Sequence, residues 1–291
     1  MTHPTLHPAI QDLVERDAAD ATLNPVCRTR FFGRPERTAQ AVVFLHGLTS
    51  CPRQFQPLAE ILAAQGVNAL TARMPYHGYA DRMTDELGRL RERDLADWAV
   101  DMAERGKALG ERVVIAGLSV GGACAAHAAQ NVAGLKGALI LAPLLRTPAV
   151  PLRWTRQAAW LFSVLPNQWR WWDPVLKDTR TAPDFSYPRL STRAVAAALG
   201  LSQRLLAAAR RTAPACKRTT LVLNENDRVV HNPSVRELAS LWQARGADAR
   251  LHAFEAGAGL AHDLVGAEHP EQKVDVVYPV VQSLLNALFN A

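Results

Sequence analysis

The chain has 291 residues, 48% of them hydrophobic, and a formal net charge of +6 at pH 7. A chain of this length can bury one large core, with room for an inserted subdomain. The sequence has no run of about 18 apolar residues, so no transmembrane helix is expected. Its start lacks a basic patch followed by an apolar stretch, so we expect no secretory signal.

Positive charge is concentrated in residues 144–218. This segment holds 13 Lys or Arg residues and three acidic residues, so its net charge is +10 and that of the remainder is −4. We interpret the segment as a solvated basic surface. The alternative is a preference for anionic substrates, or weak contact with an anionic membrane surface. No nucleic-acid-binding motif accompanies the charge, so nucleic acid is not an expected partner.

Four cysteines are scattered along the chain, none of them in C-x-x-C spacing: Cys27, Cys51, Cys124 and Cys216. This pattern is typical of reduced thiols, so we predict a cytoplasmic protein with free cysteines. We expect no metal site and no cofactor. Cys51 and Cys124 are interpreted as small apolar side chains that fill space near the site.

Short apolar runs alternate with helical patterns. In chain order we predict a peripheral helix and linker in the first 25 residues, then strand 42–45, helix 54–65, strand 67–72, helix 94–107, strand 113–116, helix 123–133, strand 138–141, strand 220–223, helix 235–244, strand 251–254 and helix 274–289. This alternation predicts a mainly parallel sheet with helices on both faces. In such sheets the ligand site lies at the carboxyl ends of the strands.

The alternation stops between residues 144 and 218, a segment with five of the seven tryptophans. Two or three short helices fit it, one of them at 194–210. We therefore predict a core formed by residues 1–143 and 219–291, with residues 144–218 inserted as a helical cap, or lid, over the strand ends.

Ser119 occupies the centre of the pentapeptide Gly117-Leu118-Ser119-Val120-Gly121, directly after a predicted strand and before a predicted helix. In a G-x-S-x-G sequence the serine sits on a tight strand-to-helix turn with its hydroxyl exposed, and the glycines permit the turn. The context therefore favours Ser119 as a nucleophile.

A serine nucleophile needs a base, and the base needs an orienting partner. Asp227 follows the strand predicted at 220–223, and His262 follows the strand predicted at 251–254. Both residues are therefore expected at the edge of the sheet where Ser119 emerges.

Other residues compete for these roles. Glu225 is the alternative acid, since it lies two residues before Asp227. His127, on the helix after Ser119, is interpreted as structural. The histidines that compete with His262 are His231 in a predicted capping turn, His252 inside a predicted strand and His269 beside a proline.

Four motifs appear in one order along the chain: the run from Phe44 to Ser50 with its His-Gly pair, the glycine-rich run 117–122, Asp-Arg-Val-Val at 227–230, and Gly-x-x-His ending at His262. In these motifs the chain resembles the capped α/β-hydrolases, and among them the carboxylesterases and monoacylglycerol lipases. The resemblance extends over residues 41–289 and is weakest in the cap. It implies the α/β-hydrolase fold, with a mainly parallel central sheet, helices on both faces and an inserted helical cap.

The resemblance also implies the roles of individual residues. Ser119 would be the nucleophile, His262 the general base and then the general acid, and Asp227 the group that holds the imidazole in the correct tautomer. The backbone N–H groups of Leu48 and Val120 would form the oxyanion hole.

Three further residues are expected to contact or shape the substrate site: His46, Gly47 and His77. The chain departs from the family pattern after the His-Gly pair, where it reads Leu48-Thr49-Ser50-Cys51. It also has Val120 where Met or Leu is common.

The implied activity is hydrolysis of carboxylic esters through an acyl-enzyme intermediate. A tryptophan-rich cap favours acyl or aromatic esters, and its basic charge suits amphiphilic substrates with an acidic group. The same triad also cleaves thioesters, amides and carbon–carbon bonds beside a ketone, and fold and triad do not separate these reactions. A different class of function, a ligand-binding receptor on a hydrolase scaffold, is the remaining alternative.

Overall fold

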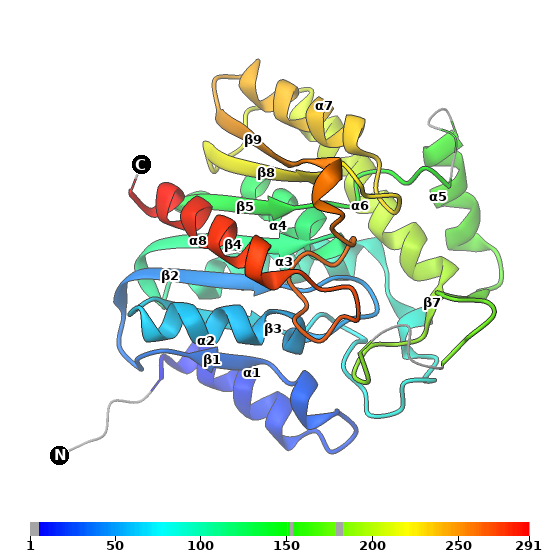
Figure 1. Cartoon of the computed structure of the whole chain (residues 1–291), viewed down its shortest axis with the longest axis horizontal. Coiled ribbons are helices and arrows are strands. Elements are labelled where there is room, and N and C mark those ends of the chain that lie inside the picture. The colour runs from blue at the N-terminus through cyan, green and yellow to red at the C-terminus, as the bar shows by residue number, and fades with distance from the viewer. Residues whose placement is uncertain (1–5, 150, 152–153, 179–182, 291) are drawn as a thin grey trace.

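A mainly parallel sheet forms the centre of the computed structural model, which describes residues 6–149, 151, 154–178 and 183–290 (Figure 1). Its strand order is β1-β3-β2-β4-β5-β8-β9, with β1 antiparallel to β3 and every other pair parallel. The strands are β1 (Arg30–Phe32), β2 (Thr38–Leu45), β3 (Asn68–Ala72), β4 (Gly110–Leu118), β5 (Gly137–Leu141), β8 (Arg218–Asn224) and β9 (Asp248–Phe254). The predicted mainly parallel sheet is confirmed.

Helices cover both faces of this sheet. In Figure 1, α2 (Gln56–Ala64) and α8 (Val274–Asn290) lie in front of it, and α3 (Glu92–Gly106) and α4 (Val120–Asn131) lie behind. In the main body of the chain, which comprises the described residues outside 144–218, the other α-helices are α1 (Pro8–Ala19), which packs against β1, and α7 (Asn232–Gln243), which packs against β8 and β9. The middle strands are apolar and buried on both faces, as sheets covered on both sides require.

The three-residue strand β1 was not predicted from the sequence. It lies at the edge of the sheet, and its side chains are only partly buried or exposed. Its sequence, Arg-Phe-Phe, is not a run of four or more apolar residues, which is the signal that identified the other strands.

The inserted segment, residues 144–218, leaves the sheet after β5 and returns at β8. It contains α5 (Thr155–Val164), the antiparallel pair β6 (Trp169–Trp171) and β7 (Arg189–Ser191), and α6 (Thr192–Ala209). Helix α6 packs against α3 and α4 of the main body, and α5 packs against α6. The division of the chain into a core and a cap stays a prediction.

Several basic side chains of the inserted segment pair with acids outside it. The pairs are Arg146 with Glu237 (2.7 Å), Arg189 with Asp85 (2.9 Å), Arg204 with Glu92 (2.7 Å) and Arg210 with Glu237 (2.5 Å). Part of the segment's positive charge is therefore balanced by carboxylates of the main body. Two arginines counted in the sequence, Arg153 and Arg180, lie outside the described residues.

None of the helices in the described ranges combines the length and the hydropathy that a membrane span requires.

Candidate active site

Ser119 lies on the turn between β4 and α4. Its φ of 58° and ψ of −116° fall in a region that residues other than glycine rarely occupy. Backbone hydrogen bonds to β5 and the residues after it hold the turn: the Ser119 N–H donates to the Leu141 carbonyl and the Leu144 N–H donates to the Ser119 carbonyl, each at 3.0 Å. The strained serine is therefore held by the neighbouring strand β5 and the residues after it.

The glycines beside Ser119 allow β2, β4 and α4 to approach closely. A Cβ atom on Gly121 would lie 2.0 Å from the Leu45 carbonyl oxygen, and one on Gly117 would lie 2.2 Å from the Gly121 carbonyl oxygen. Both neighbours are backbone atoms, so a larger side chain could not be accommodated by a rotamer change. This packing explains why the pentapeptide has glycine at both ends.

A chain of hydrogen bonds joins Ser119, His262 and Asp227. His262 Nδ1 lies 2.6 Å from Asp227 Oδ2, and His262 Nε2 lies 2.9 Å from Ser119 Oγ. Because a carboxylate only accepts, Nδ1 carries the proton and Nε2 is free to accept from the serine hydroxyl. The structure thus brings together the three residues that the sequence singled out.

Buried contacts hold the acid and the histidine in place. The Asp227 side chain is fully buried, and its Oδ1 accepts the backbone N–H groups of Val229 (2.8 Å) and Val230 (3.2 Å). At the end of β8, the buried Asn224 donates through Nδ2 to the carbonyls of Leu260 and Ala261, each at 3.0 Å. Asn224 therefore positions the segment that leads into His262, a role with no signal in the sequence.

The competing residues lie in other surroundings. Glu225 forms an ion pair with Arg236 on α7. His231 is the N-cap residue of α7, where Nδ1 contacts Ser234 Oγ at 2.7 Å. The other two histidines are occupied locally, His252 against Phe254 in β9 and His269 as the acceptor for the Glu271 N–H.

Leu48 and Val120 each present a backbone N–H without a hydrogen-bond partner among the described residues. Leu48 belongs to the loop formed by residues 46–51, which follows β2, and Val120 is the first residue of α4. Unpaired amides of this kind, one of them at a helix N-terminus, suit the stabilisation of a developing negative charge.

His46, the first residue of the 46–51 loop, and His77, which contacts that loop at Thr49, are both fully buried. His46 accepts the Met74 N–H at Nε2 (3.0 Å), so its Nδ1–H donates to the Gly47 carbonyl at 2.9 Å. His77 accepts the Thr49 N–H at Nε2 (3.3 Å), so its Nδ1–H donates to the Pro75 carbonyl at 2.9 Å.

Burial keeps both of these rings neutral, because a charged imidazole would lose its hydration. It lowers the pKa of His46 well below the usual 6.5 and that of His77 to about 4. As neutral rings, both can accept an N–H and support the loop. Their predicted contact with substrate, and that of Gly47, stays a prediction.

Thr49 connects the 46–51 loop to the inserted segment. Its φ is 65°, another value that is uncommon outside glycine. The indole Nε1–H of Trp172 donates to Thr49 Oγ1 at 2.9 Å, and the Tyr187 N–H donates to the Thr49 carbonyl at 2.8 Å. Contacts from residues far along the chain thus hold this threonine in an unfavourable conformation.

Comparison with known proteins identifies the family. The sequence matches the profile of the alpha/beta hydrolase family over residues 42–276, most of the chain. The chain belongs to the alpha/beta hydrolase family. No curated protein matches it by sequence.

Solved structures of alpha/beta hydrolases have the same fold. One is a structure reported with LipS and LipT, two metagenome-derived lipolytic enzymes, with a TM-score of 0.64, 17% identity, and coverage of 91% of this chain and 99% of the other. The monoacylglycerol lipase of Paleococcus ferrophilus has a TM-score of 0.65 at 19% identity, with coverage of 90% and 97%. A soluble variant of the Saccharomyces cerevisiae monoglyceride lipase, in complex with a substrate analogue, has a TM-score of 0.63 at 14% identity, with coverage of 90% of each chain.

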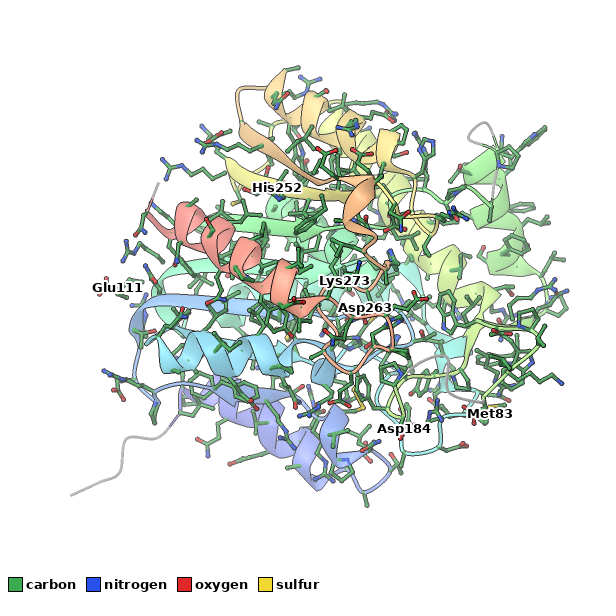
Figure 2. The ribbon with its side chains drawn as sticks, viewed as in Figure 1. Met83, Glu111, Asp184, His252, Asp263 and Lys273 are labelled. Atoms are coloured by element: carbon green, nitrogen blue, oxygen red, sulfur yellow. A yellow bond between two sulfur atoms is a disulfide. The ribbon has the colours of Figure 1, made fainter. Side chains whose placement is uncertain are left out.

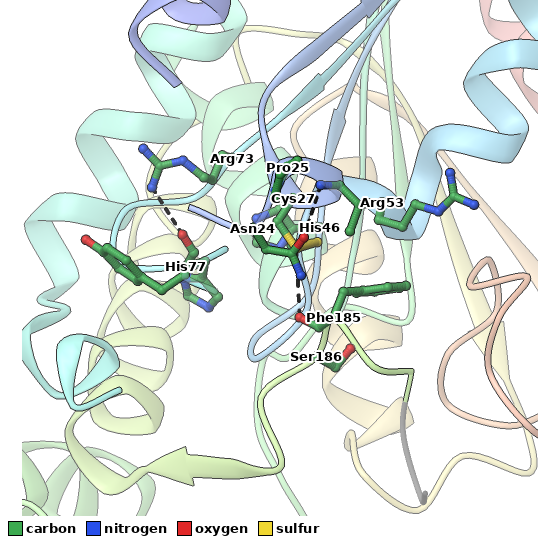
Figure 3. The surroundings of a disulfide bond; sticks show 12 residues. Asn24, Pro25, Cys27, His46, Arg53, Arg73, His77, Phe185 and Ser186 are labelled. Atoms are coloured by element: carbon green, nitrogen blue, oxygen red, sulfur yellow. Dashed lines mark hydrogen bonds between the residues drawn. A yellow bond between two sulfur atoms is a disulfide. The ribbon is translucent and has the colours of Figure 1, made fainter. Parts of the chain in front are cut away.

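The 46–51 loop of this alpha/beta hydrolase ends in a disulfide between Cys51 and Cys27, with Phe185 of the inserted segment beside it (Figure 3). The two Cα atoms lie 5.2 Å apart, an ordinary disulfide separation. The expectation of four free thiols was therefore wrong for these two residues. The two cysteines are 24 residues apart in the sequence. They meet because the short helical turns at these two positions pack together. No spacing motif in the sequence indicates such a contact.

The other two cysteines, Cys124 and Cys216, are free and buried. Burial raises the pKa of both thiols, that of Cys216 to about 11. The cytoplasmic location rested on four reduced thiols, so it stays a prediction without that support. Within the described ranges, no three His, Cys, Asp or Glu side chains are grouped so that they could hold a metal ion.

Proposed function

We propose that this alpha/beta hydrolase cleaves carboxylic esters with Ser119 as nucleophile, His262 as general base and Asp227 as orienting acid. The observation that carries the proposal is the hydrogen-bonded chain from Asp227 through His262 to Ser119, with distances of 2.6 and 2.9 Å. Hydrogen-bond reach between nucleophile, base and orienting group is the geometric signature of an activated serine.

In the acylation half-reaction, Ser119 Oγ attacks the ester carbonyl carbon while its proton passes to His262 Nε2. The fully buried carboxylate of Asp227 stabilises the imidazolium through Nδ1. As the carbon–oxygen bond to the alcohol breaks, Nε2–H gives its proton to the departing oxygen. The acyl group is then bound to Ser119 as an ester.

In the deacylation half-reaction, His262 Nε2 accepts a proton from water, and the hydroxide attacks the acyl carbon. The tetrahedral intermediate formed by this attack collapses, and the proton returns from His262 to Ser119 Oγ. This step releases the acid and restores the site. The Leu48 and Val120 N–H groups stabilise the oxyanion in both steps. Loss of one such donor costs typically ~3 kcal/mol in the barrier.

Exposed apolar side chains in the inserted segment support an apolar or amphiphilic substrate. Those exposed between residues 154 and 176 are Trp154, Trp160, Leu161, Val164, Leu165, Trp172, Val175 and Leu176. Apolar surface of this extent on one segment is typical of a surface that meets a hydrophobic ligand or a lipid interface. Combined with the segment's basic charge, it favours acyl or aromatic esters, including those with an acidic group.

Hydrolysis of a series of p-nitrophenyl esters from C2 to C16 tests this function. We expect turnover with an optimum at one acyl chain length, and loss of turnover in Ser119→Ala. Ser283→Ala changes an exposed serine on α8 and should leave the rate unchanged. Wild-type protein that cleaves no ester in the series, or a Ser119→Ala variant that stays active, would contradict the proposal.

A further inference from the structure

We infer that Gln54 is a positioning residue that couples the loop of the oxyanion donor to the loop of the catalytic histidine. The inference rests on the proposed function, since it assigns Gln54 a role in that reaction. Gln54 belongs to the short helical turn Pro52–Phe55 and is 4% exposed.

The two ends of the Gln54 amide contact the two loops separately. Its Oε1 accepts the Gly47 N–H at 2.9 Å, one residue before the oxyanion donor Leu48. Its Nε2–H donates to Asp263 Oδ2 at 2.9 Å, one residue after His262. A single buried side chain therefore connects the residues next to both groups.

Asp263 makes this connection rigid on the histidine side. It lies on the loop between β9 and α8 (Figure 2), and its Oδ1 accepts the N–H groups of Val265 (3.2 Å) and Gly266 (2.8 Å). The Tyr278 hydroxyl on α8 donates to the Val265 carbonyl at 2.8 Å. Asp263 is thus part of a turn fixed to α8, and Gln54 links the 46–51 loop to that turn.

This link lies where the reaction separates charge. Negative charge develops at the oxyanion beside Leu48, while positive charge develops on His262. The Leu48 N–H and the His262 ring must therefore each stay at a fixed distance from the reacting carbon. A displacement of about 1 Å in such a site can cost about 100-fold in rate. The turn Pro52–Phe55 makes a second contact with the loop after His262, the ion pair of Arg53 with Glu268, but both of these side chains are partly exposed and the pair is expected to be weak.

Hydrogen-bond polarity makes the coupling testable. The Gly47 N–H needs a hydrogen-bond acceptor and the Asp263 carboxylate needs a donor. A neutral amide at position 54 satisfies both, because it has one acceptor oxygen and one donor NH₂ group. In Gln54→Glu two carboxylates face each other, and in Asp263→Asn two amide NH₂ groups face each other. The double variant Gln54→Glu/Asp263→Asn restores one donor and one acceptor, because the residue-263 amide can donate to the residue-54 carboxylate, which still accepts from Gly47.

The experiment measures kcat and KM for one p-nitrophenyl ester, the rate of fluorophosphonate labelling and the melting temperature for the four members of this cycle. We expect each single variant to lose about 30-fold in kcat with KM changed less than about threefold, and the double variant to recover to within about threefold of wild type. Gln56→Glu is the matched control. Gln56, the first residue of α2, is also buried, but it donates to the Val26 carbonyl and accepts from Arg53, and it forms no hydrogen bond with Gly47 or Asp263.

Three outcomes would overturn the coupling: additive losses in the double variant, single variants that change only KM or melting temperature, or a Gln56→Glu variant with the same kcat loss. In each case an active wild-type enzyme would leave the proposed function intact. If the wild-type protein neither turns over esters nor reacts with the fluorophosphonate, the proposed function itself fails and the coupling fails with it.

Discussion

His262 contacts Asp227 through Nδ1 at 2.6 Å, while Glu225, two residues earlier, forms an ion pair with Arg236 instead. The carboxylate of Asp227 is fully buried and that of Glu225 is partly exposed. The hydrogen-bond geometry therefore favours Asp227 over the alternative acid Glu225, as the sequence does.

Asp227→Asn should lower kcat for ester hydrolysis by about 10⁴-fold, because an amide at this position favours the wrong tautomer of His262. Glu225→Gln should leave kcat within about twofold, since the exposed ion pair contributes little. Steady-state kinetics on both variants check this. A larger loss in Glu225→Gln than in Asp227→Asn would mean that the acid is misassigned.

Stability should fall on the acid side of pH 6.5 because of His77. Burial lowers the pKa of His77 from 6.5 to about 4, so between these values the unfolded chain binds a proton that the folded chain does not. The free energy of unfolding should decrease as pH drops through this window, by about 3 kcal/mol for this ring. The lowered pKa of His46 acts in the same direction.

Urea unfolding between pH 4 and pH 8 measures this dependence. The slope of the free energy of unfolding against pH should be smaller in His77→Gln, which has no imidazole at this position. It should be unchanged in His7→Asn, which replaces an exposed histidine. An identical slope in wild type and His77→Gln would contradict the assignment of a neutral, buried His77.

Gly121→Ala should destabilise the fold by about 3 kcal/mol, since the added methyl group would overlap the Leu45 carbonyl oxygen at the turn that carries Ser119. Gly257→Ala is the matched control, because a Cβ at that position meets no atom within 4 Å. Chemical denaturation of both variants gives the comparison. Equal stability of the two would show that the turn tolerates a side chain.

The Cys27–Cys51 disulfide closes a loop of 24 residues, and loop entropy then accounts for about 3 kcal/mol of stability. The double variant Cys27→Ser/Cys51→Ser should lose that amount of stability, and its free energy of unfolding should no longer change when a reductant is added. Alkylation of denatured, unreduced wild type should modify only the free cysteines, Cys124 and Cys216. Modification of all four would contradict the disulfide.

Local patterns in the sequence were sufficient for the main body of the fold. Buried strands such as β4 appear as short apolar runs, helices such as α3 show apolar residues at helical spacing, and the turn at Ser119 has its own glycine pattern. The alternation of strands and helices predicts a mainly parallel sheet, and the carboxyl ends of its parallel strands place Ser119, Asp227 and His262 at one edge.

Contacts between distant segments could not be predicted in this way. The Gln54–Asp263 and Trp172–Thr49 hydrogen bonds join residues more than 100 positions apart, and neither pair has a recognisable spacing. The Cys27–Cys51 pair is closer in sequence but depends equally on the packing of two turns. Such contacts depend on the completed fold, so a single sequence carries no local signal for them.

Covalent labelling of Ser119 tests the central claim most directly. The wild-type protein is incubated with a fluorophosphonate, digested and examined by mass spectrometry, with Ser119→Ala and Ser283→Ala treated alongside. We expect one adduct, on the peptide that contains Ser119, in wild type and in Ser283→Ala, and none in Ser119→Ala. An unlabelled wild-type protein, or an adduct on another residue that persists in Ser119→Ala, would contradict the assignment of Ser119 as the nucleophile.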